Sequence, residues 1–564
     1  MNKIFDNSAI EDRIRGICKE DLISKEIFAA CFYGPKVFCN KCRKTEMNVL
    51  LVVAAYPKKI SIFSKKSKGI NLTILVIDKD LFESDVEQGR FSDLVSDVVT
   101  LPYTPWVNPN YFENIEVKVK RRFVLELIRN LILQYPELSG MLLIKPEYFM
   151  YETVRRQVKL FPPLVLNLSD IFKGKMEKQN TTFIMKGYHK ALKNLETENY
   201  ITYSNGYVQI VKSFAEKTIR QRNRFSSVLT SIRKGLLPHI RNLSLRIRTS
   251  FRQNQILLNR RSEKQEKELR KELDETEKFL LMPSPLGLIP FSDKTTIQDF
   301  IKKTVPGGDM LDLEIERMGG VLNSVFLLRL QKNHGTQKIV VKKYEDWQGF
   351  KWFPLALWTL GTKSFAVLGK TRLEREYSNN QFLRDHGITV PKILYVSVKE
   401  RLIFEEYVEG EKLTAIIKHL IASPQENAVI VGEIVKKIGK EMARVHSLGV
   451  TLGDCKPENI LVTESNGICF LDLEQSTRSG SQSWDIAEFL YYSGHYILPI
   501  HSDQAARTIA TSLIEGYIQG RGKREYVREA ASAKYTKIFS VFTLPHIILI
   551  MANICKKLGK DETS

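Results

Sequence analysis

The chain has 564 residues, more than one ordinary hydrophobic core accommodates, so two or three domains are expected. Hydrophobic residues make up 43% of it and charged residues 26%, a balance that excludes global disorder. The net charge of +21 favours anionic partners, namely nucleotides, nucleic acid, acidic proteins or an anionic membrane surface, and does not choose among them.

The number of cysteines and the lengths of the apolar runs indicate the cellular compartment of the protein. Seven cysteines in a chain of this length do not suggest a disulfide framework, so a reducing cytoplasm is the simplest context. The first residues lack the apolar core of a signal peptide. The longest apolar run, roughly Ile538 to Ile554, contains Pro545 and Asn553 and is shorter than the ~20 residues of a spanning helix. We expect a cytoplasmic protein with no transmembrane segment.

The first part of the chain, residues 1–215, has the pattern of a compact α/β module. Val49–Ala54 and Leu72–Ile77 are short aliphatic runs of the kind that form buried strands. Lys118–Tyr135 has the spacing of a helix. These elements predict a small sheet covered by helices.

The turn Phe32–Pro35, followed by Glu46 and Asn48 ahead of an apolar strand, resembles the nucleotidyltransferase fold. That family has a Gly-Ser turn and then Asp-x-Asp at this spacing, whereas here Pro, Glu and Asn occupy the positions of the Ser and the two Asp. Nucleotidyl transfer with two metal ions needs clustered carboxylates, and Leu72–Ile77 offers no third one. We predict a degenerate, inactive nucleotidyltransferase-like domain.

Cys39 and Cys42 form a single C-x-x-C motif, with Cys18 and Cys31 nearby. Four such thiols would suit zinc. One C-x-x-C without a second pair is a weak signal, and Cys31 also fits a buried strand. The sequence leaves zinc binding open.

Residues 216–290 form a basic helical connector and linker. Lys217–Arg261 is crowded with Arg and Lys and has few acids, and Glu263–Lys278 mixes both signs as a solvated helix does. The basic stretch suits RNA or another anionic partner, and a solvated pair of basic helices is the alternative. The linker itself is marked by Pro283, Pro285, Gly287 and Pro290.

The last part of the chain, residues 291–564, is β-rich at first, from about Leu313, and helical later. Val325–Leu330 and Lys338–Lys343 are expected to be strands joined by a turn. Helical spacing predicts a helix over Arg372–His386, which Gly387 would end, and a second over Val429–His446.

Three polar side chains in the helical part have the pattern of phosphoryl transfer. That reaction needs a carboxylate beside the acceptor hydroxyl, and an amide oxygen with a second carboxylate to hold Mg²⁺ against the phosphates. Asp454 and Asn459 have the separation of the D-x-x-x-x-N catalytic loop. Asp472 ends an apolar strand shortly afterwards, where the metal-binding aspartate belongs.

The run from Asp454 to Asn459, Asp-Cys-Lys-Pro-Glu-Asn, is nearly identical to the loop of protein serine/threonine kinases, and this part of the chain resembles the protein-kinase-like superfamily. The resemblance implies two lobes, about 313–408 and about 409–564. It implies that Asp454 is the catalytic carboxylate and that Lys456 steadies the γ-phosphate. Mg²⁺ would then be held by Asn459 and Asp472.

Upstream motifs supply the ATP side of the site in the order found in kinases. Ile339-Val-Val-Lys342 resembles the V-A-I-K strand, so its lysine is expected to contact the α and β phosphates. Glu376 on the next helix is placed to pair with Lys342, although Glu374 lies on that helix too. A glycine pair belongs to an incomplete phosphate loop, and the backbone of a hinge strand would hold the adenine. The residues that the resemblance assigns to ATP binding are Gly319, Gly320, Lys342, Glu376, Glu406 and Tyr407.

Departures from the kinase pattern indicate which members of the superfamily this part of the chain resembles. Gly453 stands where many kinases have Arg, and Asp472-Leu-Glu replaces D-F-G. Trp484 and Asp485 follow so soon that a long activation loop has no room, and Asp485 is a candidate to brace the catalytic loop. These traits resemble compact RIO-type kinases and the kinase of the KEOPS tRNA-modification complex. Asp472-Leu-Glu also resembles small-molecule kinases, including those for aminoglycosides, choline and the lipopolysaccharide core.

The sequence therefore predicts an α+β multidomain protein with a nucleotidyltransferase-like α/β module, a basic helical connector and a C-terminal bilobal protein-kinase-like fold. The favoured function is that of an atypical protein serine/threonine kinase that uses ATP and Mg²⁺ and acts on a protein substrate. A small-molecule or sugar kinase is the first alternative. The second is an ATP-binding pseudokinase scaffold with a nucleic-acid-binding N-terminal half.

Overall fold

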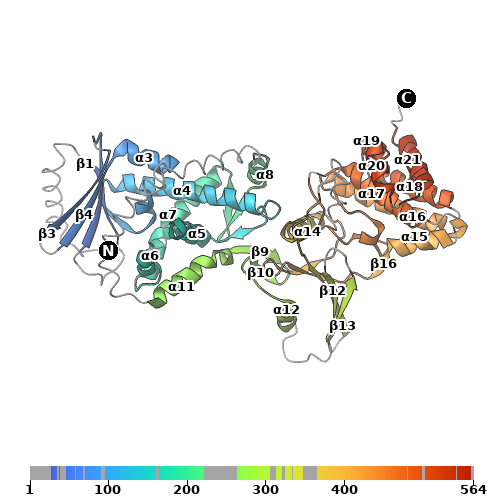
Figure 1. Cartoon of the computed structure of the whole chain (residues 1–564), viewed down its shortest axis with the longest axis horizontal. Helices are drawn as coiled ribbons and strands as arrows, with labels where there is room; N and C mark the ends of the chain where they lie inside the picture. The colour runs from blue at the N-terminus through green and yellow to red at the C-terminus, as the bar shows by residue number, and fades with distance from the viewer. Residues whose placement is uncertain are drawn as a thin grey trace. The chain divides into compact units, whose positions relative to one another are not determined.

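A computed structural model of the chain describes residues 27–34, 37, 46–57, 59–67, 70–89, 96–160, 164–221, 263–304, 313–319, 324–332, 335–346, 365–422, 424–478, 480–497, 502–541 and 543–560. The chain divides into two compact units, Met1–Leu281 and Met282–Ser564, and each is described by itself (Figure 1). Among the described residues, no helix has both the length and the apolar character needed to cross a membrane.

The first unit begins with a five-stranded sheet in the order β3-β4-β2-β1-β5. Its strands are β1 (Ile27–Tyr33), β2 (Glu46–Val53), β3 (Ile60–Ser67), β4 (Ile70–Asp78) and β5 (Tyr103–Val107). β2 and β4 are parallel, and the other neighbours are antiparallel. The predicted strands Val49–Ala54 and Leu72–Ile77 are thus adjacent in the sheet, as β2 and β4.

Alternate side chains of this sheet enter two separate cores because successive strand residues point to opposite faces. One face packs against α3 (Lys79–Gln88) and α4 (Pro109–Gln134), which Figure 1 shows beside the sheet. The predicted helix Lys118–Tyr135 is the second half of α4. Cys31 is buried on the helix-covered face as a free thiol, and Cys18, Cys39 and Cys42 lie outside the described residues.

Helices and short strands complete the first unit. The helices are α5 (Glu147–Leu160), α6 (Leu164–Phe172), α7 (Glu177–Thr197), α8 (Lys212–Arg220) and α11 (Glu263–Asp274), with the short η1 (Ser96–Thr100) and η2 (Thr276–Phe279). The strands are β6 (Leu143–Ile144), β7 (Ile201–Ser204), β8 (Tyr207–Ile210) and the start of β9 (Leu280–Ser284). Residues 222–262, and with them most of the predicted basic stretch Lys217–Arg261, lie outside the described residues.

The proline- and glycine-rich segment that the sequence marked as a linker forms β9 and β10 (Gly287–Pro290), which are neighbours in a sheet. The φ of Gly287 is 108°, a backbone conformation that favours glycine. This residue lies between Pro283 of β9 and Pro290 of β10. The boundary between the two units falls within β9, after Leu281.

After β10, the second unit continues with α12 (Ile297–Thr304) and a sheet in the order β11-β12-β13-β15-β14. Every pairing in this sheet is antiparallel. Its strands are β11 (Leu313–Gly319), β12 (Ser324–Lys332), β13 (Gly335–Lys343), β14 (Ile393–Ser397) and β15 (Leu402–Glu406). β12 and β13 are the predicted strand pair, and α14 (Gly369–Asp385) is the predicted helix that follows them.

The remainder of the second unit is mostly helical around one core. Its helices are α15 (Leu413–Ala422), α16 (Pro424–Ser447), α17 (Gln482–His495), α18 (Ser502–Gln519), α19 (Arg524–Ala530), α20 (Ala533–Phe539) and α21 (Pro545–Leu558). A small sheet consists of β16 (Gly410–Lys412), β17 (Ile460–Thr463) and β18 (Ile468–Phe470), and the helical turn η3 (Pro457–Asn459) directly precedes β17. An antiparallel sheet with one long helix, followed by a helical body, is a mixed α/β architecture consistent with a kinase-like fold.

Candidate active site

The loop between α16 and β17 brings Asp454, Lys456 and Asn459 together. Asn459 Nδ2 donates to the Asp454 carbonyl at 2.9 Å and to Asp454 Oδ2 at 3.0 Å. Lys456 Nζ lies 3.0 Å from the same oxygen. Burial opposes the charge on Lys456, but the adjacent Asp454 carboxylate outweighs it and raises the pKa of the lysine. The loop therefore presents one carboxylate held by an amide and an ammonium group.

A buried aspartate on α17 fixes the backbone of this loop. Asp485 accepts hydrogen bonds from the amide of Leu452 at 2.6 Å, the amide of Gly453 at 2.8 Å and His446 Nε2 at 3.0 Å. This is the bracing contact that the sequence predicted for Asp485. A second acid, Glu488, accepts the amide of Cys455 at 2.8 Å. Two buried side chains of one helix thus hold the residues on either side of Asp454.

Gly453, which replaces the arginine of many kinases, has a φ of 78°. A side chain in this left-handed region costs ~1–2 kcal/mol, so the backbone that meets Asp485 favours glycine. We expect Gly453→Ala to lower the free energy of unfolding by ~1–2 kcal/mol in urea titrations. Gly453→Asn should cost less, because asparagine tolerates this conformation better. Equal losses in the two variants would show that the φ angle is not the cause.

The lysine of β13 lies in a cluster of buried acids. Lys342 Nζ is 3.1 Å from Glu376 Oε1 on α14 and 3.2 Å from Glu405 Oε2 on β15. It also donates to the Leu471 carbonyl at 2.8 Å. Burial lowers the pKa of Lys342, but the negative charges of Glu376 and Glu405 have the larger effect and hold it well above the usual value. Of the two candidate acids on α14, Glu374 instead pairs with Lys370, at 3.9 Å.

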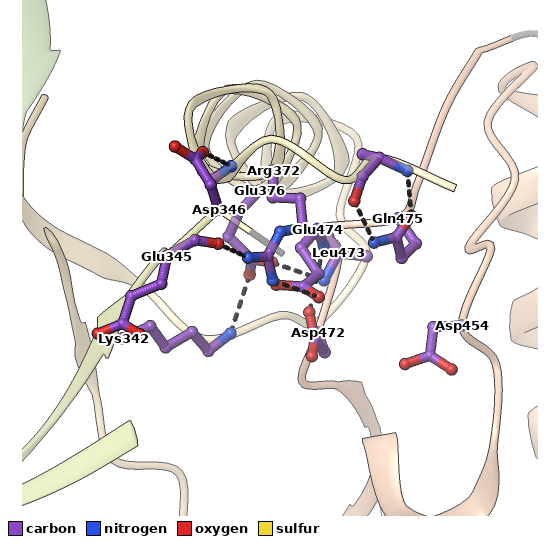
Figure 2. A network of polar contacts seen from close by, with 12 residues as sticks. Lys342, Glu345, Asp346, Arg372, Glu376, Asp454, Asp472, Leu473, Glu474 and Gln475 are labelled. Atoms are coloured by element: carbon purple, nitrogen blue, oxygen red, sulfur yellow. Dashed lines mark hydrogen bonds and ion pairs between the residues drawn. The ribbon is translucent and has the colours of Figure 1, made fainter. Parts of the chain in front are cut away.

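Asp472 lies between Lys342 and Asp454 in the view of Figure 2. It follows β18, and its Oδ1 accepts the amide of Glu474 at 3.2 Å. Carboxylate and amide oxygens are the ligands that Mg²⁺ prefers, so Asp472 and the Asn459 side chain fit such an ion chemically. The described residues contain no group of three or more His, Cys, Asp or Glu side chains arranged to hold a metal, at this site or at any other.

A second buried network joins the Asp472-Leu-Glu segment to α14 (Figure 2). Arg372 Nη1 lies 3.3 Å from Glu474 Oε1 and 3.2 Å from Oε2, and both side chains are buried. Arg372 also donates to the Glu345 carbonyl. The Leu473 amide donates to Glu376 Oε2 at 2.7 Å. The replacement of D-F-G by Asp-Leu-Glu therefore supplies an acid that ties this segment to the helix carrying Glu376.

The proposed adenine-binding residues lie at the end of β15, where Glu406 is the last residue of the strand and Tyr407 comes directly after it. The Glu406 amide donates to the Lys392 carbonyl at 2.9 Å, and the Tyr407 amide to the Lys338 carbonyl at 3.4 Å. Glu406 Oε1 accepts the amide of Lys392. These two amides are thus engaged within the protein, and adenine contacts there would use carbonyl groups. Gly319 ends β11, and Gly320 lies outside the described residues.

Glu405, Arg372 and Glu474 were assigned no role from the sequence. Glu405 interrupts an apolar strand, Leu402-Ile-Phe-Glu405, and a charged residue in such a position signals a buried partner. Arg372 and Glu376 are four residues apart on one helix and so share a face. Pairing Arg372 with Glu474 required the packing of segments about a hundred residues apart.

The antiparallel sheet with its buried Lys342–Glu376 pair, and the Asp454 loop braced from α17, define a domain of the protein-kinase-like superfamily. More narrowly, residues 327–490 match the lipopolysaccharide kinase (Kdo/WaaP) family.

Three curated relatives are each similar to about a fifth or a quarter of the chain. The KEOPS complex subunit Bud32 of Pyrococcus abyssi is 28% identical over 106 residues, 18% of this chain and 45% of the relative. The EKC/KEOPS complex subunit bud32 of Dictyostelium discoideum is 27% identical over 151 residues, 26% and 58%. A 3-deoxy-D-manno-octulosonic acid kinase of Vibrio cholerae is 28% identical over 116 residues, 20% and 48%. The chain spans about half the length of these relatives.

Proposed function

We propose that the second unit is an ATP-dependent phosphotransferase that moves the γ-phosphate of ATP to a hydroxyl group. The observation that carries the proposal is the Asp454 carboxylate, held by Asn459 and Lys456 within 3.0 Å. Such a carboxylate can accept or orient a hydroxyl proton beside an ammonium that offsets phosphate charge.

The chain's own groups divide the work in the proposed reaction. Asp454 orients the acceptor hydroxyl and takes its proton, while Lys456 offsets charge on the transferring phosphoryl group. Lys342 binds the α and β phosphates. Asn459 and Asp472 would hold Mg²⁺, which supplies charge neutralisation on the phosphates when bound. Most of the acceleration then comes from positioning and electrostatics.

The proposed acceptor is a serine or threonine hydroxyl of a protein. Lys456 contacts Asp454 directly, which supports a loop of the serine/threonine kinase type. The similarity to Bud32 proteins is consistent with a compact atypical kinase. The cytoplasmic location expected from the sequence, where ATP is available, belongs to the same proposal.

A sugar or sugar-lipid acceptor is the second candidate, and one finding favours it. Residues 327–490 match the Kdo/WaaP family, and a relative bears the name 3-deoxy-D-manno-octulosonic acid kinase. Transfer of labelled γ-phosphate from Mg·ATP separates the candidates when a generic protein and 3-deoxy-D-manno-octulosonic acid are offered in parallel. Labelled protein supports the first acceptor and labelled sugar the second. ATP binding without any transfer would support a pseudokinase scaffold.

For the first unit we propose an inactive nucleotidyltransferase-like domain that recruits a partner. Tyr33, before the Gly34 turn, pairs with Asn48 of β2, and Glu46 pairs with Asn71 at the start of β4. The only acid in β4, Asp78, lies at the opposite end of that strand, bound by Lys59 and the Tyr56 amide. Asp78, the acid of β4 whose side chain the structure describes, is therefore not at the turn, where two-metal nucleotidyl transfer would need it.

The recruitment proposal predicts binding without nucleotidyl transfer. The full chain should incorporate no α-labelled nucleotide into RNA or protein. If RNA is the partner, a fluorescent RNA should bind with an affinity that falls steeply with salt. Neutralising the arginines of Lys217–Arg261 should then weaken binding. Nucleotide incorporation that is lost in Glu46→Gln would contradict the proposal of inactivity.

A further inference from the structure

Lys342 is surrounded by more acceptors than the proposed reaction uses. An ammonium group has three N–H donors and no acceptor. Around Lys342 Nζ the chain places Glu376 Oε1 at 3.1 Å, the Leu471 carbonyl at 2.8 Å and Glu405 Oε2 at 3.2 Å. The three donors are matched by three acceptors of the protein itself. An ATP phosphate therefore competes with one of them for the lysine.

Of the two acids that contact Lys342, Glu405 has fewer hydrogen-bond donors beside it, and its other neighbour in the cluster is the Glu376 carboxyl, which is also an acid. Glu376 is also held by the Leu473 amide at 2.7 Å, and the Leu471 carbonyl is part of the backbone. Glu405, only 1% exposed, has no hydrogen-bond partner for its Oε1 among the described residues. Burial raises the pKa of the Glu405 carboxyl, and Lys342 counteracts that rise only in part. Glu405 thus depends on Lys342 more than Glu376 does.

We propose that Glu405 holds Lys342 in the nucleotide-free protein and loses it to the phosphates of ATP, so that Glu405 is a positioning residue that sets nucleotide affinity. This inference rests on the proposed function, because it requires that ATP binds at Lys342. Glu405 directly precedes Glu406, so it lies on the strand that leads to the proposed adenine site. It touches the lysine and not the reacting atoms.

Separating Lys342 from Glu405 costs free energy, and this cost weakens the binding of ATP. When Lys342 turns to the phosphates, a buried carboxylate loses its cation, and an unpaired buried charge is unfavourable. A neutral side chain of similar shape at position 405 removes that cost. We expect Glu405→Gln to bind Mg·ATP about tenfold more tightly than the wild type, the factor that corresponds to one charge-assisted hydrogen bond.

The test is calorimetric titration of Mg·ATP into the full-length wild type, Glu405→Gln and Glu405→Met. The control is Glu515→Gln, which removes an exposed acid of α18 that pairs with Lys436 on α16, outside the residues assigned to the site. Both substitutions of Glu405 should tighten binding, and the control should change it less than about twofold. The KM for ATP should fall with little change in kcat, because Lys342 contacts the phosphates in both proteins. Unchanged or weaker binding in both Glu405 variants would overturn the inference.

A double-mutant cycle with Lys342→Met shows whether Glu405 acts through the lysine. In the Lys342→Met background, Glu405→Gln should tighten ATP binding by less than about twofold. The reason is that Glu405 and the ATP phosphates no longer have a lysine for which they compete. A full tenfold gain there would mean direct repulsion of the phosphates and would reject the positioning role. If the wild type binds ATP and the Glu405 variants bind it no more tightly, this inference is wrong but the proposed function stands. Absence of ATP binding in every variant defeats the proposed function as well.

Discussion

Asp454→Ala is expected to slow phosphoryl transfer by ~10²–10⁴-fold, the contribution of a positioned general base. The substitution removes the carboxylate that Asn459 and Lys456 hold at 3.0 Å. Binding of Mg·ATP should change much less, because Lys342 belongs to a separate cluster on β13 and α14. The measurement is single-turnover transfer of labelled γ-phosphate, with nucleotide affinity determined on the same preparations.

Asp454→Asn separates chemistry from loop structure. The amide keeps the size of the side chain and removes its charge and its ability to take a proton. We expect it to be nearly as inactive as Asp454→Ala, and the control Asp503→Ala, at the exposed first turn of α18, to be fully active. Near-normal transfer by Asp454→Asn would mean that the carboxylate only shapes the loop. The proposed proton transfer would then be wrong.

Arg372→Met is expected to destabilise the protein by ~3–5 kcal/mol, because it leaves the Glu474 carboxylate buried without its cation. The arginine is 0% exposed and the glutamate 3% exposed, so water cannot replace the partner. Urea unfolding followed by tryptophan fluorescence would measure the loss, since Trp484 is buried in the hydrophobic core of the second unit. As a control, Lys370→Met breaks a partly exposed pair with Glu374 and should cost at most ~1 kcal/mol.

Removing both charges should recover most of that stability, because buried ion pairs are often replaceable by apolar side chains. The double variant Arg372→Met, Glu474→Leu is therefore expected to be markedly more stable than Arg372→Met alone. Its KM for ATP should nevertheless rise, since the tie between α14 and the Asp472 segment is lost and Glu376 lies on that helix. A cost below ~1 kcal/mol for Arg372→Met would show that the pair does not hold these elements together.

The sequence was most informative where the reacting groups lie close together in the chain. Asp454 and Asn459 are five residues apart in one loop, so their contact depends on local geometry. The brace from Asp485 was also predictable, because a short connection leaves few places for the next helix to begin. The choice of Glu376 over Glu374 depends on which face of α14 points inward, and two residues along a helix turn a side chain by more than half a circle.

The sequence by itself determined the kinase-like elements, the strands β12 and β13, the helix α14 and the order of Lys342, Glu376, Asp454, Asn459 and Asp472 along the chain. Only the tertiary structure decided that Glu405 joins Lys342 and that Arg372 joins Glu474. The physical reason is that local patterns report periodicity and short-range spacing. The partner of a buried charge is chosen instead by the packing of strands and helices that are distant in sequence.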